Sequence, residues 1–94
     1  MTNHSPELSI VELITAIACA LVDKPEEVSV VQASDQTGTV IRLRVDPTDV
    51  GKVIGKQGRT ARSLRTLLGA ISVKLKHRYS LEILEERGQD MEEK

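Results

Sequence analysis

The chain has 94 residues, which fits one domain and leaves no room for two. Its most apolar run, residues 10–22, is too short to span a bilayer, and no Lys or Arg precedes it as a secretory signal requires. Cys19 is the only cysteine, so no intrachain disulfide can form. We therefore expect a cytoplasmic protein that makes no contact with a membrane.

The net charge of −1 conceals a strong separation of charge along the chain. Residues 1–50 carry 8 Asp or Glu and 3 Lys or Arg, whereas residues 51–78 carry 8 Lys or Arg and no acid. Residues 79–94 are acidic again, with 6 Asp or Glu and 2 Lys or Arg. A basic block of this length in a slightly acidic protein is typical of a site for a polyanion. The alternative is a solvated helix face with no ligand.

The first predicted element is a helix over residues 10–22. Ser9 and Glu12 have the spacing of a capping box at its start. Apolar residues recur at helical spacing along it, and Pro25 prevents its continuation. We expect residues 1–8 to form a mobile segment before the folded domain.

A hairpin and two helices follow. Residues 28–33 and 39–45 read as strands, because β-branched residues are frequent and apolar and polar side chains alternate in the second run. Residues 34–38 contain the polar residues and glycine of a turn. Asp46 then predicts the N-cap of a short helix that has Pro47 at its first position and ends near Ile54.

A long helix is predicted from Gly58 or Arg59 to about Lys76, with core residues three and four apart. Residues 78–84 alternate as a third strand, and residues 85–94 read as an acidic C-terminal tail. The order is helix, strand, strand, helix, helix, strand, so the chain is predicted to be an α+β domain over residues 9–84.

The segment Gly55-Lys56-Gln57-Gly58 lies between the two predicted helices. Its glycines permit a sharp turn and leave room for a phosphate, and the following helix offers unpaired backbone amides. Lys56 and Arg59 add full charges, and Arg62 and Arg65 follow at intervals of three along the same side. A Gly-x-x-Gly corner alone is weak evidence, since Gly55 could simply end a helix. The corner combined with the basic block predicts nucleic-acid binding. The spacing fits neither a P-loop nor a dinucleotide fingerprint.

Residues 53–58, Val-Ile-Gly-Lys-Gln-Gly, resemble the V-I-G-x-x-G core of KH domains, and the element order resembles the type II form, α-β-β-α-α-β. Residues 21–26, 45–47 and 49–59 resemble the small single-KH bacterial proteins of the KhpA (YlqC) family. The resemblance implies a three-stranded sheet with helices packed on one face, and a Gly-x-x-Gly loop that clamps about four nucleotides. Together, the basic block and the resemblance predict the RNA-binding residues Lys52, Val53, Ile54, Gly55, Lys56, Gln57, Gly58, Arg59, Arg62 and Arg65, with Lys52 the one of them that could most readily be a bystander. Arg42 and Arg44 of the neighbouring strand are further candidates for contact with base edges.

The same resemblance implies a role as an RNA chaperone or post-transcriptional regulator acting on single-stranded RNA. It implies a homodimer or a heteromer with a larger KhpB-type KH protein, and a link to cell-wall and cell-length control. With Tyr79 as the only Phe, Tyr or Trp, RNA must bind without a platform of such rings, so avidity would be needed for tight binding.

Two other functions stay open from the sequence: a helix-turn-helix that binds duplex DNA, and a KH-fold interaction module that binds no RNA. Catalysis is not expected. The candidate acid–base or nucleophilic groups, Cys19, His4 and His77, are isolated from one another along the chain, and three such residues make no metal site. No cofactor is expected either.

Overall fold

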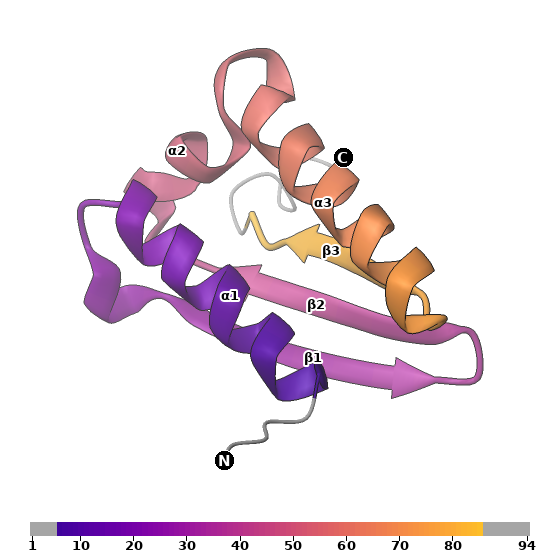
Figure 1. The fold of residues 1–94 in the computed structure, drawn as a ribbon. Helices are drawn as coiled ribbons and strands as arrows, with labels where there is room; N and C mark the ends of the chain where they lie inside the picture. The colour runs from indigo at the N-terminus through magenta and orange to yellow at the C-terminus, as the bar shows by residue number, and fades with distance from the viewer. Residues whose placement is uncertain (1–5, 86–94) are drawn as a thin grey trace, which may run out of the picture.

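The computed structural model describes residues 6–85, and these confirm the predicted α+β order. The long elements are α1 (Pro6–Leu21), β1 (Ser29–Asp35), β2 (Gly38–Arg44), α2 (Val50–Ile54), α3 (Arg59–Leu75) and β3 (Tyr79–Ile83) (Figure 1). Single 3₁₀ turns occupy Pro25–Glu27, Pro47–Asp49 and Lys56–Gly58. The proposed acidic tail, apart from Glu85, lies outside the described residues.

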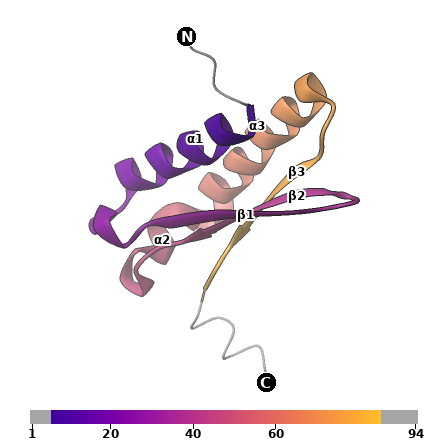
Figure 2. The same cartoon turned by 90° about the horizontal axis from the view of Figure 1, so that it is seen from below.

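The three strands form one sheet in the order β1-β2-β3. β1 and β2 are an antiparallel hairpin whose last pair is Asp35 with Gly38, while β3 runs parallel to β2 from the pair Thr39–Tyr79 to Leu43–Ile83. Helices α1 and α3 lie on the same face of this sheet, and α2 lies at one end of the layer (Figure 2). The prediction of a three-stranded sheet with helices packed on one face is confirmed.

The core consists of aliphatic side chains together with Tyr79. Ile41 and Leu43 of β2, and Val45 just after the strand, are at most 5 % exposed and face the helices. The other elements supply the remaining buried apolar residues: Ile10, Ile14, Ala18, Val22, Val53, Ala61, Leu64, Leu68, Tyr79 and Leu81. The outward residues of β2 leave the opposite sheet face in solvent, where Arg42 Nε pairs with Glu82 Oε1 at 2.8 Å.

Helix α1 begins earlier than predicted. It starts at Pro6, so Ser9 lies inside the helix and the predicted capping box at a start near residue 10 is wrong. Proline is well suited to a first helical position because its missing N–H has no partner there in any case. Part of the segment predicted to be mobile, residues 6–8, is therefore helical, and residues 1–5 lie outside the described residues.

Asp46 caps the turn before α2 as predicted. Its carboxylate accepts a hydrogen bond from the Thr48 amide at 3.0 Å and one from the Thr48 hydroxyl. These bonds lower the pKa of Asp46 below its ordinary value of 3.8, with the hydroxyl the larger cause. The predicted single helix is a 3₁₀ turn over Pro47–Asp49 followed by α2, which has five residues.

Candidate nucleic-acid interface

The loop between α2 and α3 depends on a backbone conformation at Gly55 that other residues rarely adopt. Gly55 has φ 81° and ψ 167°, a region occupied almost only by glycine. A Cβ built at this position would lie 2.3 Å from the Thr60 hydroxyl oxygen and 2.8 Å from the Thr60 amide nitrogen. The α2–α3 corner is therefore closed so tightly that no side chain fits at Gly55.

Two further residues complete the reversal of the chain. Gln57 has φ 57° and Gly58 has φ 75°, so both are in the left-handed region. A Cβ at Gly58 would meet nothing within 4 Å, which leaves open space beside the loop. The loop projects from one end of the molecule, at the top of Figure 1. It leads directly into α3, where the first-turn amides and the helix dipole favour a negative charge.

An open groove with a volume of about 470 Å³ begins under this loop. It is lined by Ile54, Gly58, Ala61, Arg62, Arg65, Ile83 and Glu85. The half-buried Ile54 and Ile83 give it an apolar wall, and two arginines from successive turns of α3 give it positive charge. The groove therefore combines the surfaces that a base and a phosphate each require.

The basic side chains around the groove differ in whether they have hydrogen-bond partners within the protein. Arg65 donates from Nε and Nη2 to the carbonyl oxygen of Leu81, both at 3.3 Å, so its guanidinium bridges α3 and β3. Arg59 Nη2 donates to Gln57 Oε1 at 3.4 Å across the loop. Lys56 and Arg62 are exposed and make no ion pair with any side chain that the structure describes, residues 10–85. Their charges are thus available to a ligand.

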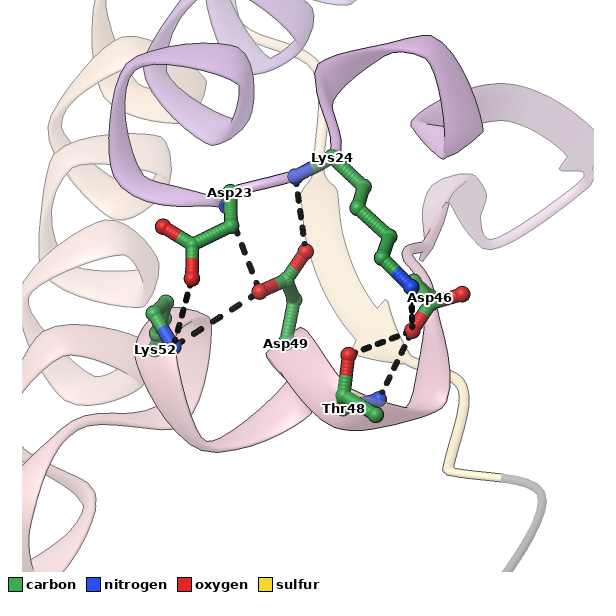
Figure 3. Close-up of polar contacts among 6 residues, drawn as sticks. All are labelled: Asp23, Lys24, Asp46, Thr48, Asp49 and Lys52. Atoms are coloured by element: carbon green, nitrogen blue, oxygen red, sulfur yellow. Dashed lines mark hydrogen bonds and ion pairs between the residues drawn. The ribbon is translucent and has the colours of Figure 1, made fainter.

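Lys52 does not join this group. Its ammonium lies 3.5 Å from Asp23 Oδ2 and 3.7 Å from Asp49 Oδ1, on the side of α2 that faces the segment after α1 (Figure 3). Asp49 is 1 % exposed, and its carboxylate also accepts the backbone amides of Asp23 at 3.2 Å and Lys24 at 3.0 Å. The structure therefore gives Lys52 a part in fixing α2 to the end of α1.

Three other predicted contacts also lie elsewhere. Val53 is fully buried in the core, because it faces the sheet from the short α2 helix, so it cannot offer a surface to a base. Arg42 is on the sheet face opposite the helices, paired with Glu82, and Arg44 alternates to the same face. Neither arginine lines the groove. The structure thus brings together Ile54, Gly55, Lys56, Gln57, Gly58, Arg59, Arg62 and Arg65.

Sequence reasoning missed three residues that shape the site. Asp49 is recognisable only as an acid in a first helical turn, because its two amide donors lie 25 and 26 residues earlier in the chain. Thr60 follows the loop without any local motif, yet it fills the space next to Gly55. The wall residue Ile83 was identified as part of a strand but not of the site.

The residues considered for catalysis contact different parts of the fold. The Cys19 thiol lies 3.9 Å from the carbonyl oxygen of Pro25, and His77 Nε2 lies 2.7 Å from the Thr39 hydroxyl oxygen. His4 lies outside the described residues. In the range 6–85, no group of three His, Cys, Asp or Glu side chains could hold a metal ion. No helix in that range has the length and apolarity to cross a membrane.

A two-stranded hairpin, a parallel third strand and a Gly-x-x-Gly corner before the last helix define a KH domain. The family model for the KhpA/KhpB KH domain matches residues 11–83. The RNA-binding protein KhpA of Treponema pallidum is 53 % identical over 74 residues, which cover 79 % of this chain and 92 % of that protein. The RNA-binding protein KhpA of Borreliella burgdorferi is 48 % identical over 75 residues, covering 80 % and 92 %. That of Aquifex aeolicus is 50 % identical over 74 residues, covering 79 % and 94 %. The chain belongs to the KhpA/KhpB family of KH domains.

Proposed function

We propose that this protein binds single-stranded RNA at the Gly55–Gly58 loop and the groove beneath it. The observation that carries the proposal is the position of the loop, which is closed by glycines and opens onto a groove with apolar and cationic walls. The relatives named above are RNA-binding proteins, and a KH loop holds about four nucleotides. The protein acts by binding and has no catalytic step.

The chemistry of binding follows from the groups at the site. Phosphates are bound by Lys56 and by backbone amides of the loop and the first turn of α3, while Gln57 can donate from its amide. Arg59 and Arg62 neutralise charge on the flanking phosphates. The bases lie in the groove against Ile54, with their edges toward β3.

Binding at one loop is expected to be weak and tolerant of sequence. Tyr79, the only residue of the Phe, Tyr and Trp type, is 5 % exposed and forms part of the core, so it offers no stacking surface. Avidity from a homodimer or from a larger KhpB-type KH partner would compensate. An RNA-chaperone role in the cytoplasm, with a link to cell-wall and cell-length control, remains a prediction of the family resemblance.

The test is fluorescence anisotropy of a labelled single-stranded RNA over a salt series. The variant Lys56→Asp, Gln57→Asp places like charge in the loop, and the control Lys74→Asp, Gln36→Asp makes the same exchanges at exposed positions far from it. For about four phosphate contacts, log K should fall with log salt at a slope near about −3. We expect the loop variant to lose binding and the control to keep it.

Equal binding by the loop variant and the control would overturn the assignment to the loop. Stronger binding of duplex DNA than of single strands would favour a helix-turn-helix mode. Absence of binding to any nucleic acid by the wild type, alone and with a KhpB-type partner, would favour the pure interaction module.

A further inference from the structure

A second hollow lies at the opposite end of α3, with a volume of about 400 Å³. It is lined by Gly69, Ser72, Val73, Lys76, His77, Arg78 and Tyr79. Like the groove under the loop, it is bounded by α3 on one side and by β3, or residues next to β3, on the other. The two hollows share no lining residue, but both lie along the boundary between α3 and β3, which we call the seam, and the hydrogen bonds from Arg65 to the Leu81 carbonyl cross this seam between Tyr79 and Ile83.

The helix residues of this seam share one face of α3. Gly58, Arg62, Arg65, Gly69, Val73 and Lys76 follow one another at intervals of three or four. The 17 residues of α3 span about 25 Å. Four stacked nucleotides cover roughly 14 Å at about 3.4 Å each, so a strand held at the loop reaches the second hollow after a few more nucleotides.

The second hollow offers the same kinds of surface as the first. Lys76 and Arg78 are exposed and make no ion pair among the described side chains of residues 10–85. Lys76 also has φ 56° at the end of α3, a position where glycine is the usual residue. Val73 lies beside them and, at 78 %, is the most exposed large apolar side chain of the described residues.

The hollow also contains an exposed ring in a defined orientation. The His77 ring packs on Tyr79 with 4.9 Å between centroids, and its Nε2 contacts the Thr39 hydroxyl at 2.7 Å. That hydroxyl, in turn, contacts the Ser34 hydroxyl at 2.8 Å. Histidine is one of the side chains on which RNA bases stack. The fold thus supplies at this end the ring surface that the loop groove does not have.

Gly69 keeps the middle of the seam open. Glycine is unfavourable inside a helix, and a Cβ at this position would meet nothing within 4 Å, so the packing of the protein does not require it. Absence of a side chain allows another backbone to approach the helix closely.

We propose that single-stranded RNA bound at the loop continues along the α3–β3 seam to a second subsite formed by Val73, Lys76, His77 and Arg78. There Lys76 and Arg78 bind phosphates and the His77 ring receives a base. The inference rests on the proposed function and extends its footprint beyond about four nucleotides.

The test compares oligouridylates of 4 and 12 nucleotides by anisotropy. Two matched pairs of variants isolate the seam: Lys76→Glu against Lys74→Glu, and Gly69→Leu against Ala70→Leu. Lys74 and Ala70 are exposed on α3 and do not line either hollow. Leucine is a better helix former than glycine, so lost binding in Gly69→Leu would not reflect unfolding.

We expect each seam variant to lower the affinity for the 12-mer about fivefold or more, and to leave the 4-mer within about twofold. The salt slope of the wild type should be steeper for the 12-mer, and Lys76→Glu should reduce it by about 0.7–1. Longer RNA also binds more tightly because it offers about nine registers to a four-nucleotide site. That gain is independent of Lys76 and of salt, so it cannot mimic the subsite.

Amide chemical-shift changes in the wild type give a second readout that needs no variant. The 4-mer should shift residues 55–62, and the 12-mer should shift residues 69–78 in addition. Identical sets of shifts for both lengths would overturn the subsite while leaving the loop function intact. Shifts confined to residues 69–78 would overturn the loop function and the continuous path together.

Discussion

The conformation of the loop predicts different stability effects at three neighbouring glycines. In Gly55→Ala, the new Cβ would lie 2.3 Å from the Thr60 hydroxyl oxygen in a backbone region that costs about 1–3 kcal/mol for other residues. Relief of that overlap adds about 1–3 kcal/mol, so we expect a total loss of about 2–6 kcal/mol. In a domain of this size such a loss lowers Tm by roughly 10–50 °C.

Gly58→Ala should be much milder. Its φ of 75° costs an L-residue about 1–2 kcal/mol, and a Cβ there meets nothing within 4 Å. Gly51→Ala serves as the control, because Gly51 lies inside α2 with open space around it. Alanine at that position should stabilise the domain by about 0.5–1 kcal/mol.

Thermal and urea unfolding followed by circular dichroism measure all three variants. A companion variant, Thr60→Ala in the Gly55→Ala background, removes the nearest atom but leaves the Thr60 amide nitrogen 2.8 Å from the new Cβ. We therefore expect only partial rescue. Equal losses for Gly55→Ala and Gly58→Ala, or full rescue by the companion, would refute the reasoning from loop geometry.

Three further predictions concern charged groups. Asp49→Ala leaves the part-buried backbone amides of Asp23 and Lys24 without their buried carboxylate acceptor, so it should lower stability by about 2–4 kcal/mol in urea unfolding, whereas Asp49→Asn should cost less; equal costs would contradict a role for both oxygens. The pKa of Asp46 is below 3.8 in the folded state, so the contribution of this carboxylate to stability is present above pH 3.8 and is lost as the pH falls through the folded pKa. In Thr48→Ala, an NMR titration should show the pKa of Asp46 moving up toward 3.8. An unchanged pKa would refute the Thr48 hydrogen bonds as its cause. Glu85→Gln removes a negative charge from the groove wall and should raise RNA affinity, measured by anisotropy, about two- to threefold at low salt. The gain in affinity should vanish at high salt, and a gain that persists there would contradict an electrostatic cause.

Local signals in the sequence were sufficient to predict the order of elements and the position of the loop. Asp46 and Pro47 mark a helix start, and two glycines three apart mark the corner between helices. The start of α1 was wrong because the capping-box pattern at Ser9 competes with a proline that also begins helices. Each of these signals depends on residues within a few positions of one another.

The composition of the site could be predicted less completely, because burial and ion pairing depend on distant parts of the chain. Val53 and Ile54 are equivalent apolar residues in the sequence, yet one is fully buried and the other lines the groove. Lys52 resembles the other cations of the basic block until Asp23, 29 positions earlier, is found beside it. Only the tertiary structure separates the cations that are available to a ligand from Lys52, which is paired with two carboxylates of the fold.

The contacts of Val53, Asp49 and Lys52 explain how the short helix α2 holds the loop in position. α2 has five residues and would not be stable alone, since isolated helices of fewer than about 12 residues are marginal in water. Its orientation is therefore fixed by tertiary contacts, with Val53 in the core on one side and the Asp49–Lys52 network on the other. A loop whose ends are fixed in this way would lose little conformational entropy on binding the RNA proposed as its ligand. Each phosphate contact is weak and is screened by salt. A small loss of loop entropy would therefore matter most at a site without large aromatic side chains, where no strong stacking adds to the affinity for RNA.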